Sequence, residues 1–458
     1  MKNNDIALLQ EMVYNAVKHD TEYADIFIQS GVSHSIHYED GRTEEITSSN
    51  TDGCGARVIA GGRTFYSHTP GCSARHASKA LSASLDSSGA GVLREASLPS
   101  DDLIEFNKRA NPLDALIFKR IDAEIRKSSK YVRQVMFSYQ VSERKVLIIG
   151  SDGSAVQDSR NYCTFAAQVI TEKDGELHTG SERRSMAQLE NFWKGASPDD
   201  VARAALNRAL LMLDAKPCPA GRMEVLLAGD AGGTIVHEAC GHGLEADIVE
   251  KDFSVYKDKI GKRVANEMIT MVDDPTIACL YGSYKYDDEG TPAQRNVLIE
   301  NGVLKKYMTD ILSARSYGMQ LTGNGRRQSY RSIPVPRMSN TYIMSGESEP
   351  EEMLARTGNG LLVKKMGGGE VNPTTGDFVF YVSEAWLVEK GRTSYPVRGA
   401  TLIGNGPETL RNIALLGKCL VMDAGVCGKS GQSVPVTDGQ PSMLVSNLTV
   451  GGSEECRG

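Results

Sequence analysis

The sequence lacks the features that mark membrane and secreted proteins. No apolar run reaches the length of about 20 residues with which a helix crosses a bilayer. The first 20 residues, MKNNDIALLQEMVYNAVKHD, show no secretory signal pattern and instead carry an apolar stripe at helical spacing. We therefore expect a soluble, cytoplasmic protein that has no membrane partner.

An excess of positive charge is missing as well. The 458 residues include 51 Lys and Arg against 58 Asp and Glu, which gives a net charge of −7. This balance creates no general attraction for phosphate backbones, so we expect no direct binding of nucleic acid.

The sequence also lacks a C-x-x-C pair, although it has nine cysteines. They are scattered and odd in number, and free thiols are the normal state in a reducing compartment. A cysteine in a chemically interesting setting is therefore a candidate ligand or nucleophile and not half of a structural disulfide.

The chain contains a succession of strand and helix signals in two parts. Strand-like segments follow the first helix at residues 23–30, 34–40 and 56–67, and a helix at 197–215 begins with a capping box of Ser197 and Asp200. Beyond it, Asn301-Gly302 and Lys390-Gly391 join strand-like runs as tight hairpin turns. The pattern predicts an α+β fold whose second part is rich in strands.

The segment KPCPAGR, residues 216–222, is the best domain boundary, because two prolines and a glycine follow a finished helix. We place an N-terminal domain of sheet plus helices at 1–218 and a β-rich C-terminal domain at 219–458. A further boundary inside the first domain falls in the loop-like interval 89–112.

The segment HEACGH, residues 237–242, raises the question of a metal site. It opens like the zinc-protease motif H-E-x-x-H, but His237 and His242 are five residues apart. On a regular helix such residues differ by about 140° in azimuth and cannot share an ion. A π-turn, or a helix that ends near Gly241, would bring them together. The alternative is a polar helix with one buried and one exposed histidine, and the spacing alone leaves both interpretations open.

A catalytic zinc ion usually has three protein ligands and one water, so two histidines are too few. The candidates for the third ligand are Cys240, Glu245 and Asp247 close by, and Cys427 far along the chain.

The sequence resembles the TldD/PmbA family of intracellular metalloproteases. HEACGHGLEAD is similar to the metal motif of that family. Further blocks follow in family order: GSYKYDDEGTPAQRNVLIENGVLKKYM, TGNGRRQSYRSIPVPRMSNTYI, GGGEVNPTTGDFVFYVSEAWLVEKG and GVCGKSGQSVPVTDGQP. The first half resembles the family more loosely, in VKHDTEYADIFIQ.

The resemblance implies that His237, His242 and Cys427 bind the metal and that Glu238 is the catalytic acid and base. Because the chain retains every motif residue, it is similar to the TldD branch and not to the PmbA/TldE-like branch, which has lost the motif. We predict Cys427 over Cys240 because a ligand from a distant segment would close a walled cleft over the ion.

The residue types fit hydrolysis. Three protein ligands leave one position for a water, whose pKa the metal lowers towards neutrality. Glu238 could take the proton of that water and pass it to the leaving amine. A thiolate ligand suits zinc and also iron, so we expect one divalent ion per chain, zinc first and iron as the alternative.

We therefore expect a metallopeptidase that hydrolyses short or unfolded peptides. The resemblance implies a dimer, formed either by two copies or with a motif-less paralogue. The competing class is a non-catalytic regulatory partner, since family members have carried the description "modulator of DNA gyrase".

Four other stretches attract attention. YDDEG (286–290) is interpreted as a solvated turn rather than a second cation site. The basic segment GNGRRQSYR (323–331), with Arg326 and Arg327, could bind a peptide carboxylate or form an interface. MGGGE (366–370) offers backbone that could pair with a peptide strand. The tail SEECRG (453–458) extends past the usual end of the family.

Overall fold

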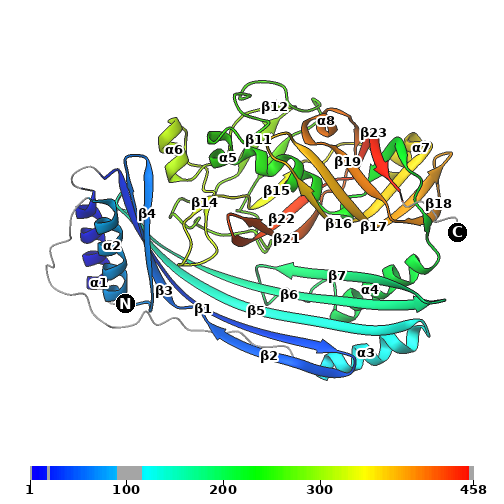
Figure 1. Cartoon of the computed structure of the whole chain (residues 1–458), viewed down its shortest axis with the longest axis horizontal. Helices are drawn as coiled ribbons and strands as arrows, with labels where there is room; N and C mark the ends of the chain where they lie inside the picture. The colour runs from blue at the N-terminus through cyan, green and yellow to red at the C-terminus, as the bar shows by residue number, and fades with distance from the viewer. Residues whose placement is uncertain (1–2, 18–20, 90–115, 453–458) are drawn as a thin grey trace.

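The computed structural model describes residues 3–17, 21–89 and 116–452, and every structural statement below concerns these residues. The expected inner boundary at 89–112 and the tail 453–458 lie almost entirely outside them. The fold is α+β, as the sequence predicts (Figure 1).

Seven strands of the described N-terminal half form one antiparallel sheet with two very long central strands. In spatial order the sheet contains β4 (Arg63–Pro70), β3 (Gly53–Ala60), β1 (Tyr23–Glu39), β5 (Val132–Gly150), β6 (Ala155–Lys173) and β7 (Glu176–Met186), with β2 (Arg42–Asn50) beside β1. The sheet passes beneath the C-terminal half as a curved platform (Figure 1).

Four helices cover one face of this sheet: α1 (Asn3–Ala16), α2 (Ala74–Ser88), α3 (Leu116–Ser128) and α4 (Pro198–Leu213). Alternate residues of a strand point to the same side. On β1, Ile26 and Ile28 pack with α1 and α2 at one end, and Ile36 and Tyr38 pack with α3 and α4 at the other. The opposite face, which carries Phe27, is thereby left to contact the C-terminal half.

The C-terminal half contains two larger sheets within its described residues. The first has eight strands: β16 (Gly360–Val371), β9 (Gly221–Leu227), β23 (Met443–Gly451), β19 (Thr401–Asn405), β17 (Asp377–Glu389), β18 (Arg392–Arg398) and β8 (Lys216–Pro217), with β20 (Ile413–Leu416) beside β23. Because β16 pairs with both β9 and β17, this sheet closes on itself.

The second sheet has six strands in the described chain, with β21 at its edge. Their order is β12 (Val303–Leu304), β11 (Asn296–Glu300), β10 (Met271–Asp273), β15 (Asn340–Ile343), β22 (Gln432–Gln440) and β21 (Val421–Lys429). A small pair, β13 (Gly325–Arg326) and β14 (Val335–Pro336), and the short helices α5 (Ala246–Glu250), α6 (Ile311–Tyr317), α7 (Pro350–Thr357) and α8 (Gly406–Arg411) complete this half.

The local signals of the sequence are confirmed where they depend on turns and caps. The capping box of Ser197 and Asp200 starts α4. Asn301-Gly302 turns with φ of 47° and 78°, and Lys390-Gly391 with 52° and 73°, the left-handed conformation that tight hairpins need. None of the helices in the described part of the chain combines the length and the apolar character that spanning a membrane would require.

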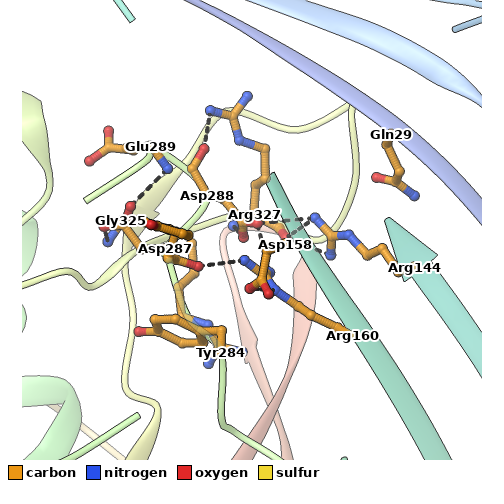
Figure 2. A network of polar contacts seen from close by, with 12 residues as sticks. Gln29, Arg144, Asp158, Arg160, Tyr284, Asp287, Asp288, Glu289, Gly325 and Arg327 are labelled. Atoms are coloured by element: carbon orange, nitrogen blue, oxygen red, sulfur yellow. Dashed lines mark hydrogen bonds and ion pairs between the residues drawn. The ribbon is translucent and has the colours of Figure 1, made fainter. Parts of the chain in front are cut away.

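Buried ion pairs join the N-terminal sheet to the C-terminal half. We call them the arginine network and define it by four arginines and their carboxylate partners: Arg57, Arg144, Arg160, Arg327, Asp25, Asp158, Asp288 and Glu289. Arg57 of β3 is completely buried and contacts Glu289 of the other half at 2.6 Å. Asp288 Oδ1 lies 3.2 Å from the Arg144 guanidinium and 2.8 Å from that of Arg160, within the group of polar residues drawn in Figure 2.

The arginine network bears on two predictions, the solvated turn at residues 286–290 and the role of Arg326 and Arg327. The solvated turn expected at residues 286–290 is wrong, because Asp287, Asp288 and Glu289 are each no more than 2% exposed. Asp288 and Glu289 pair with arginines more than 100 residues away, which local patterns cannot show. Arg327 contacts Asp25 of β1 at 3.5 Å, and Arg326 donates to the Pro435 carbonyl at 2.7 Å. Arg327 therefore lies at the interface between the two halves, whereas Arg326 is buried inside the C-terminal half.

Candidate metal centre

The two histidines of the HEACGH segment lie on a π-helix. Strand β9 leads through a single turn of 3₁₀-helix to the π-helix Ile235–Gly241, and a second 3₁₀ turn follows at His242–Leu244. The His242 N–H donates to the His237 carbonyl, the i to i−5 bond that defines a π-turn. The rings of His237 and His242 consequently lie close together, with centroids 5.0 Å apart and planes at 87°. The predicted irregularity is confirmed in its π-turn form.

Close packing explains the glycine inside this helix. Gly241 has helical dihedral angles, so it is not needed for a left-handed conformation. A Cβ at this position would lie 2.0 Å from the Sδ of Met338, which is completely buried. The π-helix lies between the two sheets of this half, in contact with β15 and β22 on one side and β16 and β17 on the other. The fold therefore holds both histidines on a helix that cannot shift outward easily.

Strand β21 brings Cys427 to the same point. Its Sγ lies 3.5 Å from Nε2 of His242, and one ligand atom from each of His237, His242 and Cys427 lies within 4.8 Å of the others. All three side chains are buried. Cys240 lies in the apolar core, and burial raises the pKa of its thiol to about 12. Among the sulfur atoms weighed from the sequence, Cys427 is the one that faces the histidines.

Two carboxylates contact the outer nitrogens of these histidines. Asp438 Oδ1 lies 2.7 Å from Nδ1 of His237, and Glu245 Oε2 lies 2.9 Å from Nδ1 of His242. A carboxylate on Nδ1 favours a proton there and leaves the lone pair on Nε2. Glu245 thus contacts Nδ1 of His242 and is not placed as a metal ligand. Asp247 contacts Lys429 at 2.6 Å and is not placed as a ligand either.

Electrostatics within the cluster favours a charged thiolate. Burial alone would raise the pKa of Cys427, but the two imidazoles beside it lower it to about 4. Burial would lower the pKa of His242, whereas Glu245 and Cys427 raise it to about 9. The pKa of His237 is raised well above its usual value by Asp438 and Cys427, against the effect of burial. A thiolate and two imidazole nitrogens that lie close together form a donor set that fits zinc or iron.

Glu238 lies at the open side of the cluster. Its side chain is 31% exposed, whereas that of His242 is 10% exposed, and its Oε2 is 3.9 Å from Nε2 of His242. The position next to His237 on the π-helix thus places a carboxylate at the rim of the space between the ligand atoms. It can reach a molecule there without entering the buried set.

A buried His–His–Cys set beside a partly exposed glutamate is a candidate metal centre, and comparison with known proteins gives the family. Family models for the PmbA/TldA metallopeptidase domain 1, central domain and C-terminal domain match residues 24–88, 94–213 and 220–452. The chain belongs to the PmbA/TldD family of metallopeptidases.

Two relatives illustrate the match. A metalloprotease TldD homolog of Buchnera aphidicola is 37% identical over 94% of this chain and 93% of its own length. A zinc metalloprotease TldD homolog of Saccharolobus solfataricus is 30% identical over 71% of both chains.

Solved structures share the fold. A Thermotoga maritima protein named as a modulator of a DNA gyrase superposes with a TM-score of 0.75 at 22% identity and covers 97% of this chain and 100% of its own. TldE from Thermococcus kodakarensis gives 0.74 at 18% identity, with the same coverage. These likenesses concern the fold alone.

The sequence did not point to Asp438 or to Lys429. Asp438 is 201 residues from His237, so no spacing rule connects them. One signal was available: the turn at Ser430-Gly431 returns the chain as β22, which must bring residues near 438 back along β21. Lys429 shares β21 with Cys427 at a distance of two residues, and strand alternation puts both on one side.

Proposed function

We propose that this metallopeptidase binds one divalent ion, zinc in the first place and iron as the alternative, through Nε2 of His237, Nε2 of His242 and Sγ of Cys427. The observation that carries the proposal is the convergence of one ligand atom from each of these three residues within 4.8 Å. Asp438 and Glu245 support it, because each occupies the nitrogen that a metal would leave unused. When bound, the metal supplies a Lewis acid and a water of lowered pKa.

Glu238 is the proposed acid and base. Its carboxylate lies at the open rim, 3.9 Å from a ligand nitrogen, so it can accept a proton from a water at the centre. The same group can then donate that proton to the leaving amine of a cleaved peptide bond. Partial exposure keeps Glu238 in contact with solvent and substrate, in contrast to the buried ligands.

Short or unfolded peptides are the proposed substrates. A cavity of about 600 Å³ lies between the N-terminal sheet and the C-terminal half, with Lys365 and Asp423 in one wall. Asp423 pairs across β21 and β22 with Asp438, the partner of His237, so this wall adjoins the centre. On β16, the described pairing with β9 ends at Val363, and residues 366–370 are proposed to pair with an extended peptide along that edge.

The assembly and location of the protein remain proposals. We propose a cytoplasmic dimer without bound nucleic acid, formed by two copies or with a motif-less paralogue of the TldE type. The division into domains at 218 and 219 likewise stays a prediction.

Metal content and turnover test the proposal together. Protein purified without chelator should contain about one zinc or iron per chain by elemental analysis and should cleave unstructured peptides. Glu238→Gln should retain the metal and lose most turnover, because Glu238 is not a ligand. Turnover at the parent rate in Glu238→Gln would contradict its role. A metal-free chain without peptidase activity would favour the regulatory partner instead.

A further inference from the structure

Strand β21 contacts one ring nitrogen of His242 directly and reaches the other through Glu245. Cys427 Sγ lies 3.5 Å from Nε2, and Lys429 Nζ lies 2.9 Å from Oε2 of Glu245, the oxygen that contacts Nδ1. Residues 427 and 429 lie on the same side of the strand because side chains alternate. One strand therefore determines the position of both ring nitrogens, directly at one and through a carboxylate at the other.

The surroundings of Lys429 are those of a fixed cation rather than a solvated surface lysine. Its side chain is 10% exposed, and Nζ has three acceptors: Glu245 Oε2 at 2.9 Å, Asp247 Oδ1 at 2.6 Å and the Pro336 carbonyl at 2.9 Å. An ammonium group has three donors, so all of them are used. Lys429 therefore has one orientation, and that orientation depends on Glu245.

Glu245 needs such a partner. Its side chain is 0% exposed and its Oε1 has no hydrogen-bond partner among the described residues, so both of its polar contacts meet at Oε2. A buried carboxylate is costly without a counter-charge. Asp438, the carboxylate beside His237, is placed differently: the contacts described for it include no lysine or arginine within ion-pair distance. The carboxylate beside His242 thus has a lysine as counter-charge, whereas no such partner is described for the carboxylate beside His237.

We propose that Lys429 is a positioning residue that fixes Glu245 against Nδ1 of His242 and thereby aims Nε2 at the metal. This inference rests on the proposed metal site and adds the element that orients one of its ligands. Lys429 touches neither the metal nor the substrate in this role. It also joins β21 to the segment after the π-helix, so the cysteine and the histidine are positioned relative to each other by one residue.

Metal affinity is the principal test, measured by competition of zinc against a chromophoric chelator. Loss of a partner that orients a metal-binding histidine typically weakens affinity about 10–100-fold, and we expect this range for Lys429→Met. Lys429→Arg should restore part of the affinity because it keeps the charge. Lys305→Met is the control, since Lys305 lies in the same half of the protein and contacts Glu300 at 3.0 Å but no histidine partner. It should change affinity less than about 2-fold.

A second readout separates positioning from general loosening. In zinc-loaded protein labelled with ¹⁵N-histidine, Lys429→Met should shift or broaden the Nδ1–H signal of His242 and leave that of His237 in place. Asp247→Asn removes an anchor of Lys429 but not its contact with Glu245, so it should weaken zinc binding by much less than Lys429→Met. If Lys429→Met does not fold, Lys429→Gln, which keeps hydrogen-bond donors without the charge, provides the same comparison.

The outcomes are distinct. Unchanged zinc affinity in Lys429→Met or in a folded Lys429→Gln, equal effects on both histidine signals, or an equal loss in Asp247→Asn would overturn the positioning role. Absence of both zinc and iron binding in the parent protein would instead overturn the proposed function itself.

Discussion

The arginine network and the metal centre are both buried clusters of polar side chains, yet they differ in how charge is arranged. In the arginine network each guanidinium meets carboxylates of opposite sign, as Arg57 does with Asp25 and Glu289. In the metal centre three lone-pair donors point at one another, and the carboxylates lie behind them. A cluster of the first kind is complete by itself, whereas the second is proposed to hold a cation.

The arginine network and the metal centre also differ in their exposure to solvent. Asp25, Arg57 and Glu289 are entirely buried, so nothing outside the protein can reach them. In the metal centre Glu238 is 31% exposed at the rim. The network therefore joins the two halves of the protein, and the centre, which solvent reaches at Glu238, is the proposed site of substrate binding. Each prediction below alters one of these clusters.

Removing a charge from the arginine network should have the largest effect on stability. Arg57→Met leaves the carboxylates of Asp25 and Glu289 buried without their partner, which typically costs about 3–5 kcal/mol. Urea unfolding followed by circular dichroism measures the loss. Arg120→Met is the control, because Arg120 is 47% exposed in its pairs with Glu124 and Asp199 and should contribute at most about 1 kcal/mol. Equal midpoints for the two variants would show that the network does not join the halves.

Removing the sulfur of the metal centre should affect metal binding more than folding. Cys427→Ser should weaken zinc binding by more than the roughly 10–100-fold that loss of an orienting partner costs, because a ligand itself is lost. Elemental analysis after dialysis against a weak chelator provides the measurement. Cys163→Ala, at a buried cysteine of the N-terminal sheet, is the control and should retain the metal. Full metal occupancy in Cys427→Ser would exclude Cys427 as a ligand.

The pH dependence of stability should come from the carboxylates around the network. Burial raises the pKa of Asp287 to about 7 and that of Glu289 to about 8. Because these folded-state values exceed the unfolded ones, the folded protein holds more protons across the interval. Stability is therefore fully present at low pH and declines as pH rises from about 5 to 8, by at most about 1.4 kcal/mol per pH unit for each proton.

Urea midpoints at pH 6 and pH 9 check this decline. Glu289→Gln should show a shallower decline than the parent, and Asp214→Asn, at a carboxylate that is 77% exposed, should match the parent. A parent protein that becomes more stable over this interval would contradict the raised pKa values.

The two clusters also differ in how far the sequence predicted them. His237, Glu238 and His242 lie within six residues, so their types and spacing raised the question of a metal. A π-turn was one of the two geometries that would allow it. Cys427 came from the family resemblance, since no spacing rule spans 185 residues. The α+β class and the hairpin turns followed from local patterns. The arginine network was missed because Arg57 and Glu289 lie 232 residues apart and their pairing exists only once the halves are in contact.

The smallest effect is expected at Cys240, which belongs to the metal motif by sequence and to the apolar core by position. Its side chain is fully buried, and a shift to alanine removes only a sulfur atom from packed surroundings. We expect Cys240→Ala to cost about 1 kcal/mol of unfolding free energy, at the low end for small core truncations, and to leave zinc affinity unchanged. Urea unfolding and chelator competition on the same sample measure both quantities. Because Cys240 lies three residues from His237 and two from His242, a loss of zinc in this variant would reverse the assignment of the sulfur ligand. It would also mean that the π-helix alone, without β21, forms the centre, and the contrast between a closed network and an open site built from two segments would no longer hold.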